Sequence, residues 1–275
     1  MFEALIVPLD GSEFAAQAVP VAVAIARTGH VGLRLVGVAR DEGERAAVRR
    51  YVDGTAREVP ATVVPEVDVI LDADPVRALL ELAADGTSVL CLASHDRGRV
   101  AARIMHSVGS ALVARARQPI VVVGEHVAAS VGANDVVVAV DGVHDPLPLV
   151  ATAVAWARQL WAPLRIVTVY EPTLADQDQP SHSTRQDGPP VDPDVYLGAI
   201  ERGVEEEGLV SVSTTAIASP VGVGEGLVDH LADRPAQLLV VGGRRHGGPD
   251  RPSGTVRGLL RTALVPLLVV NQRGG

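Results

Sequence analysis

Residues 89–124 read VLCLASHDRGRVAARIMHSVGSALVARARQPIVVVG, and residues 238–271 repeat the pattern as LLVVGGRRHGGPDRPSGTVRGLLRTALVPLLVVN. Each version starts with a continuous apolar run, which is typical of a strand that is covered on both faces of a parallel sheet. A loop with arginine and glycine follows, then an amphipathic segment, then proline and a second apolar run. Each version therefore predicts a strand, a loop, a helix and another strand.

The loop of each version begins where a strand ends and stops where a helix begins. In open α/β sheets, ligands bind at the carboxyl ends of the strands, and the free N–H groups of a helix N-terminus favour anions. The two loops are therefore candidate anion-binding sites.

The residues before each version complete two similar halves. The first half is expected to have strands at 5–9, 31–38 and 62–71 and helices near 19–26, 42–58 and 76–83. The second half is expected to have strands at 136–140, 164–169 and 211–217 and helices near 150–161, 195–207 and 223–231. This alternation predicts a parallel sheet with helices on both faces in each half. We expect one domain at 1–125, a linker at 126–134 and a second domain at 135–275.

One segment departs from the alternation. Glu171–Asp194 reads EPTLADQDQPSHSTRQDGPPVDPD and is rich in Pro, Asp, Gln and Ser. Such a composition has few apolar side chains to bury, and its prolines oppose helix. We expect a mobile excursion here, the part of the native protein that a protease cuts first.

Composition limits the function classes. The chain has 275 residues, 47% of them hydrophobic, which predicts a globular protein. No apolar run is long enough for a membrane span, and an acid stands near the N-terminus where a signal peptide needs basic residues, so a cytoplasmic protein without a membrane partner is expected. The net charge of −9 argues against nucleic-acid binding.

The reactive residue types are few. All 24 basic residues are arginine, which excludes a Schiff-base lysine and a P-loop lysine. Cys91, the single cysteine, lies in an expected buried strand and is interpreted as a core residue. Gly222, Gly224 and Gly226 are interpreted as a helix start rather than a dinucleotide-binding loop.

Three features of each half resemble the universal stress protein family in its tandem two-domain form. They are an apolar first strand that ends in Asp-Gly (VPLDGS, VAVDGV), the strand–loop–helix stretch, and a final Pro-apolar strand (QPIVVV, VPLLVV). The resemblance implies an α/β fold of two tandem doubly wound domains, each with a five-stranded parallel sheet in the order 3-2-1-4-5. It further implies that strands 120–123 and 267–270 face each other across a pseudo-twofold axis. The chain would then be an intramolecular pseudo-dimer; further homodimerisation stays open.

The resemblance also implies ATP with Mg²⁺ as the cofactor. In ATP-binding members the loop carries Gly, two residues, Gly, nine residues, then Gly with Ser or Thr, because glycines let the backbone approach the phosphates. In the second half this pattern falls on Gly242, Arg245 and Gly254-Thr255, with one residue fewer before Gly254. The first-strand Asp is implied to face the nucleoside, and the end of the second strand to line the base pocket. The favoured nucleotide site therefore comprises Asp141, Val169, Gly242, Gly243, Arg245, Gly254, Thr255 and Val256.

The first half carries the pattern less well, because it falls on Ala93, Asp96, His106 and Ser107 and all three glycines are missing. A carboxylate about 4 Å from a phosphate charge would cost on the order of 4 kcal/mol at an effective dielectric constant near 20. The weaker candidate site comprises Asp10, Val38, Ala93 and Ser107. If ATP binds, we expect the second half to bind it.

Alternative interpretations stay open. Asp10 and Asp141 can equally be turn residues, since Asp-Gly is a strong turn signal without any ligand. The resemblance favours a non-catalytic, ATP-binding regulatory module of the stress response. The alternative is a nucleotide-free scaffold or interaction protein of the same fold. An enzyme is the weakest hypothesis, because no nucleophile–base pair and no acidic pair for a catalytic metal is evident, and no catalytic or metal-binding residue is assigned.

Overall fold

The computed structural model describes residues 1–94, 103–127, 134–142, 144–172, 192–205, 211–243 and 254–271, with residues 103–107 described as backbone only. The first half contains β1 (Ala4–Leu9), the 3-10 helix η1 (Ala15–Gln17), α1 (Ala18–Gly29), β2 (Gly32–Ala39), α2 (Glu42–Glu58), β3 (Glu66–Leu71), α3 (Pro75–Leu82), β4 (Ser88–Ala93), α4 (Arg103–Arg115) and β5 (Ile120–Val123). The second half contains β6 (Asp135–Val140), α5 (Leu147–Gln159), β7 (Leu164–Tyr170), α6 (Pro193–Glu205), β8 (Val212–Ala218), α7 (Val223–Asp233), β9 (Ala236–Gly242), α8 (Gly254–Thr262) and β10 (Leu267–Val270).

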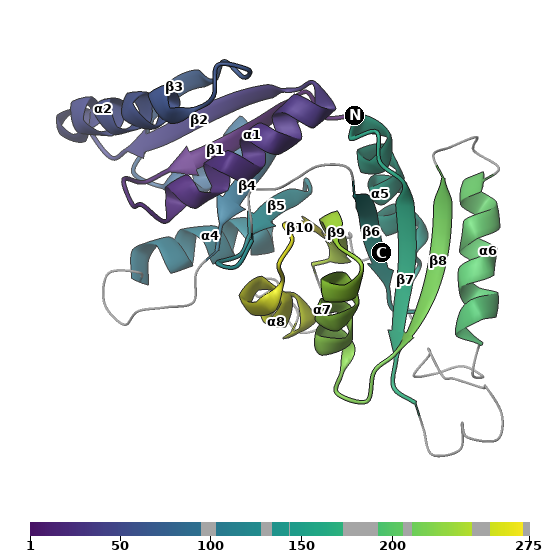
Figure 1. Ribbon diagram of the computed structural model, residues 1–275. Helices are drawn as coiled ribbons and strands as arrows, with labels where there is room; N and C mark the ends of the chain where they lie inside the picture. Colours follow the sequence, from purple (N-terminus) through teal and green to yellow (C-terminus); the bar gives the residue numbers. More distant parts are fainter. Residues whose placement is uncertain are drawn as a thin grey trace.

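The ten strands form one continuous sheet in the order β3-β2-β1-β4-β5-β10-β9-β6-β7-β8 (Figure 1). Each half therefore has the expected order 3-2-1-4-5, and its strands are all parallel. The halves join through β5 and β10, which pair antiparallel with Val121 opposite Leu268. This pairing satisfies the backbone groups that each half would otherwise expose at an edge, and it confirms the pseudo-twofold arrangement.

Four helices cover each face of the sheet. Along β1, Leu5 and Val7 point to the cluster beneath α1, α2, α5 and α6, whereas Ile6 points to the cluster beneath α3, α4, α7 and α8. Since both faces are covered, the central strands are almost entirely apolar. Each fully buried Leu, Ile or Val contributes about 1.5–3 kcal/mol of transfer free energy. Cys91 is fully buried on β4, and burial raises the pKa of its thiol to about 12, which confirms it as a core residue.

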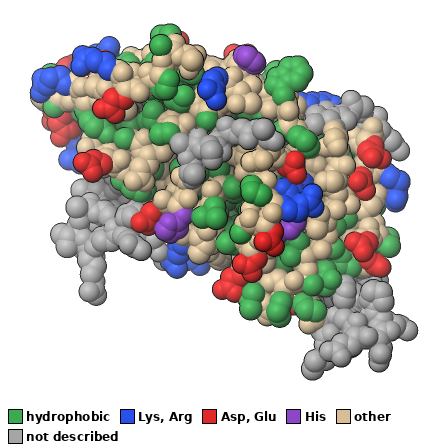
Figure 2. All heavy atoms as spheres, in the orientation of Figure 1, with side chains coloured by type: hydrophobic (Ala, Val, Ile, Leu, Met, Phe, Trp, Pro, Cys, Tyr) green, Lys and Arg blue, Asp and Glu red, His purple; other side chains and the backbone are tan. Residues whose placement is uncertain are grey.

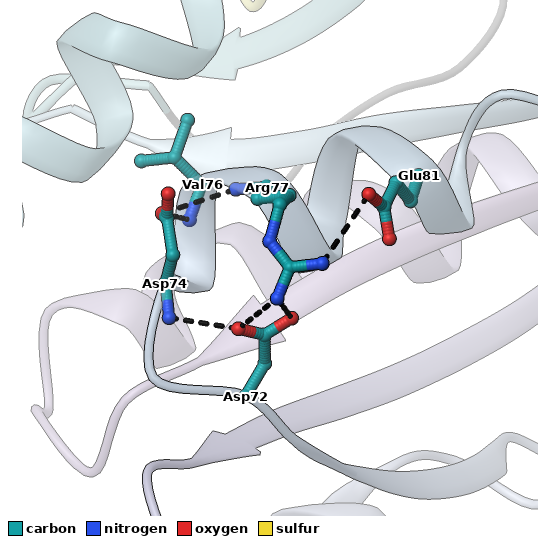
Figure 3. A network of polar contacts seen from close by, with 5 residues as sticks. All are labelled: Asp72, Asp74, Val76, Arg77 and Glu81. Atoms are coloured by element: carbon teal, nitrogen blue, oxygen red, sulfur yellow. Dashed lines mark hydrogen bonds and ion pairs between the residues drawn. The ribbon is translucent and has the colours of Figure 1, made fainter.

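A short sequence signal sets the start of α3. The Asp74 carboxylate accepts hydrogen bonds from the N–H groups of Val76 (3.0 Å) and Arg77 (3.2 Å), and Pro75 occupies the first helical position (Figure 3). The Arg77 guanidinium in turn bridges Asp72 (2.7 Å) and Glu81 (3.5 Å). A cap of this kind is worth about 1 kcal/mol, so Asp74 and Pro75 together fix the start of α3.

Two expected boundaries are wrong. The third strand begins at Glu66 rather than at residue 62, because Val63 N–H donates to the Pro60 carbonyl in a turn (3.0 Å). Helix α6 begins at Pro193, inside the expected excursion, because Asp192 accepts hydrogen bonds from the N–H groups of Asp194 and Tyr196. Residues 173–191 of the expected excursion lie outside the described residues.

The structure contains no described helix that is both long and apolar enough to cross a membrane.

Candidate functional site

The carboxyl ends of the inner strands carry most of the site residues that the sequence suggests. Asp141 follows β6, Val169 lies near the end of β7, and Gly242 ends β9. Strand β6 pairs with both β7 and β9, so the three strand ends lie at one edge of the sheet. In the first half Asp10, Val38 and Ala93 occupy the corresponding ends of β1, β2 and β4.

The glycines of the two Asp-Gly turns both have a positive φ, but the aspartates have different side-chain partners. Gly11 and Gly142 adopt φ of +91° and +68°, values that favour glycine. Asp10 Oδ1 accepts hydrogen bonds from Ser12 N–H (3.1 Å) and Ser12 Oγ–H (2.6 Å). The Asp10 carboxylate therefore has local partners of the kind that turn residues have.

Asp141 is paired with His144, a residue that the sequence analysis did not select. His144 N–H donates to Asp141 Oδ1 (3.1 Å), and His144 Nδ1 lies 2.7 Å from Asp141 Oδ2. Both side chains are about two-fifths exposed, at 38% each. The three-residue interval from Asp141 to His144 was the available signal, because a side chain at that spacing can fold back onto a turn carboxylate.

A side chain of α2 also hydrogen-bonds the turn that follows β1 in the first half. Tyr51 Oη–H donates to the Ser12 carbonyl at 2.8 Å. Burial, more than any other cause, raises the pKa of Tyr51, so the phenol keeps its proton as a donor. The bond fixes the turn after β1 against the second helix of the same half.

Two second-half glycines have no close neighbour among the described residues. A Cβ added at Gly242 or at Gly254 would meet no described atom within 4 Å. Gly254 is exposed and opens α8, Thr255 is half-buried, and Val256 is buried. The described part of the chain therefore leaves the Cβ positions of Gly242 and Gly254 clear, at the end of β9 and at the N-terminus of α8.

Other residues of the loop pattern are less open or are not described. Gly243 N–H donates to the Val270 carbonyl (2.8 Å), and a Cβ on Gly243 would overlap the Asn271 side chain. Arg245 lies outside the described residues. In the first half Ala93 is half-buried, Asp96 lies outside the described residues, and the side chains of His106 and Ser107, which belong to α4, are not described.

The expected base-pocket residues are packed within the fold. Val38 and Val169 are half-buried on the sheet face that α3 and α7 cover. A Cβ on Gly226 of α7 would lie 3.1 Å from Val169 Cγ1, so that glycine permits the close contact between α7 and β7. Gly222 has φ of +113° and immediately precedes α7, which confirms the interpretation of this glycine run as a helix start.

Charge is mixed on the surface around these elements. On the face seen in Figure 2, acidic and basic side chains are interspersed among hydrophobic and neutral ones. Within the described ranges, no group of three or more His, Cys, Asp or Glu side chains is placed to hold a metal ion.

The fold defines a class: tandem doubly wound α/β proteins with a 3-2-1-4-5 sheet in each half. The chain belongs to the universal stress protein family, whose model matches residues 1–124 and 133–271. It is similar over 98% of both chains to a universal stress protein from Archaeoglobus fulgidus DSM 4304, at 16% identity and a TM-score of 0.65.

Two further solved structures share the fold. A putative universal stress protein from Pseudomonas aeruginosa UCBPP-PA14 aligns with 98% of this chain and 93% of its own, at 14% identity and a TM-score of 0.59. The cytoplasmic domain of a prokaryotic cation chloride cotransporter aligns with 98% of this chain and 96% of its own, at 14% identity and a TM-score of 0.55. None of the curated proteins matches the chain.

Proposed function

We propose that this chain is a non-catalytic regulatory protein that binds ATP with Mg²⁺ in its second half. The single observation that carries the proposal is that no described atom lies within 4 Å of a Cβ added at Gly242 or at Gly254, which lie at the end of β9 and the start of α8. Backbone N–H groups without a side chain beside them can approach phosphate oxygens closely, and the N-terminus of α8 favours their negative charge.

The remaining second-half residues have supporting roles in this proposal. Thr255 offers a hydroxyl beside Gly254, Arg245 offers positive charge, and Gly243 continues the turn from Gly242. Asp141 and Val169 would contact the nucleoside, and Val256 fixes the first turn of α8 through its burial. Nucleotide binding by Asp141 requires its carboxylate to exchange the His144 contact for the ligand.

The first half is the weaker site in this proposal. Ala93 stands where the second half has Gly242, and its methyl group takes up space that a phosphate oxygen would need. His106 precedes Ser107 where Gly254 precedes Thr255. The two halves would therefore differ in nucleotide affinity although they share one fold.

Titration calorimetry with ATP and Mg²⁺ tests the proposal. Wild-type protein should release heat with one ATP per chain, and Gly254→Asp should abolish it, since a carboxylate about 4 Å from a phosphate costs on the order of 4 kcal/mol, or nearly a thousandfold in affinity. His106→Asp, the matched change in the first half, should leave the affinity unchanged.

The opposite response of the two variants would overturn the assignment to the second half. Absence of heat in the wild type, together with absence of nucleotide from the supernatant of denatured protein on an anion-exchange column, would instead favour a nucleotide-free interaction protein. The local partners of Asp10 and Asp141 favour this second candidate, because these carboxylates are engaged without a ligand.

A further inference from the structure

Asn271 makes a contact between the two halves at the end of β10. Its side-chain Nδ2 donates hydrogen bonds to the carbonyl oxygens of Val113 (2.7 Å) and Ala116 (2.9 Å). These carbonyls lie at the C-terminal end of α4, where the last carbonyls of a helix lack intrahelical partners. One side chain of the second half therefore caps a helix of the first half.

The Asn271 side chain also packs against Gly243, the residue that follows β9 in its own half. A Cβ at Gly243 would overlap Asn271 Oδ1 and lie 2.8 Å from Val269 Cγ1. The Gly243 N–H donates to the Val270 carbonyl at 2.8 Å. The backbone that continues Gly242 is thus hydrogen-bonded to the end of β10 and lies against the Asn271 carboxamide.

The pseudo-twofold counterpart lacks this side chain. Gly124 follows β5 as Asn271 follows β10, and a Cβ on Gly124 would lie 2.9 Å from the Leu260 carbonyl oxygen at the end of α8. A backbone glycine therefore takes the place of the capping amide. The side-chain link joins the second-half candidate site to the first-half helix α4, with no equivalent from Gly124 to α8.

We propose that Asn271 is a positioning residue that couples the Gly242–Gly243 turn to α4 of the other half. The inference rests on the proposed function in one respect: ATP that orders Gly242 would also order the end of α4 through Asn271. The contact lies at the C-terminal end of α4, so occupancy of the second half would be transmitted to that end of the first-half helix.

Hydrogen exchange without nucleotide is the first test. Asn271→Asp keeps the size of the side chain, removes both donors and sets a carboxylate against two carbonyl oxygens. Asn271→Ala removes the amide without adding charge. Both variants should speed exchange about tenfold in the amides at the end of α4 and in the turn at Gly243, because the hydrogen bonds from the Asn271 amide are lost.

Gln118→Glu is the matched control. The Gln118 side-chain amide donates to the carbonyl of Ala83, the residue that follows α3, so it makes the same kind of cap within one half. This variant should alter exchange around Ala83 and leave the turn at Gly243 and the end of α4 unchanged. Faster exchange at α4 without faster exchange at Gly243 in the Asn271 variants, or no change at either place, would overturn the coupling.

A second arm adds ATP and Mg²⁺. In wild-type protein the ligand should slow exchange both at the Gly242–Gly243 turn and at the end of α4, and the α4 effect should vanish in Asn271→Ala but persist in Gln118→Glu. Slowing of α4 that survives in Asn271→Ala would overturn the coupling. Absence of any slowing in the wild type would overturn the nucleotide proposal, while the exchange pattern without nucleotide still decides the coupling.

Discussion

Arg34 and Arg165 occupy the same position in the two halves, yet they lie in different surroundings. Each pairs with the third residue of the first strand of its half, Ile6 or Val137. The Arg34 side chain is 27% exposed and reaches two edge-strand carboxylates at 3.4 Å, whereas the Arg165 side chain is 1% exposed. One repeated position therefore serves as a surface ion pair in one half and as a buried charge in the other.

The partners of Arg165 come from several elements. Its Nε lies 3.0 Å from Asp135 Oδ2 of β6, its Nη1 lies 3.0 Å from His230 Nε2 of α7, and its Nη2 donates to the Arg234 carbonyl at 3.1 Å. An arginine has no acceptor, so His230 Nε2 must accept and the imidazole must be neutral, with its proton on Nδ1. Sequence repetition therefore conserves the fold of the halves but not the environment of a repeated side chain.

The largest expected effect is the difference in stability loss between Arg165→Ala and Arg34→Ala. Arg165→Ala should lower the free energy of unfolding by about 3–5 kcal/mol, because it leaves Asp135 without its partner and empties a buried space. Arg34→Ala should change it by about 0–1 kcal/mol, as for other exposed pairs. Urea unfolding of both variants measures the difference, and equal effects would contradict the contrast between the halves.

A second expected effect concerns the junction between the halves. Gly124→Ala would place a methyl group 2.9 Å from the Leu260 carbonyl oxygen, so the helix end must shift, and stability should fall by about 1–3 kcal/mol. Gly54→Ala in α2 is the matched control, since a Cβ there meets no described atom within 4 Å. That change should stabilise the protein by up to about 1 kcal/mol through helix propensity. Thermal unfolding compares the two, and equal melting temperatures would argue against close packing at Gly124.

The smallest expected effect is a pH dependence of the free energy of unfolding, which arises from His230 in the second half. Burial first, and then the charges of Arg165 and Arg234, lower the pKa of His230, while Asp233 opposes them. Between the lowered pKa and the ordinary value of about 6.5 the unfolded chain binds more protons, so stability falls as pH drops below about 6.5. The loss is at most about 1.4 kcal/mol per pH unit.

His230→Gln isolates that contribution. Glutamine can accept a hydrogen bond from Arg165 without titrating. The stability of the variant should therefore fall less than that of the wild type between pH 7 and pH 5. The measurement is the free energy of unfolding of both proteins across this range. Parallel curves would show that His230 does not supply the pH dependence.

Much of the fold could be predicted because it is encoded in neighbouring residues. The bounds expected for the second helix, 42–58, are those of α2, and the Asp74-Pro75 start of α3 is local chemistry between adjacent residues. The strand order came from the family resemblance, and the pairing of β5 with β10 agrees with it. The candidate site is less complete: Gly242 and Gly254 have no described atom near their Cβ positions, while the nucleotide itself and the domain bounds at 125 and 135 stay predictions.

The sequence by itself determined the repeated unit, the helix caps and the placement of both loops after buried strands, because these depend on apolar periodicity and on residues a few positions apart. Only the tertiary structure decided which side chains meet across the chain. Arg165 meets His230, Gln159 donates to the Phe2 carbonyl at 2.8 Å, and Asn271 caps α4. Such contacts depend on how two halves of one sheet pack together, and residues more than sixty positions apart carry no local pattern that specifies them.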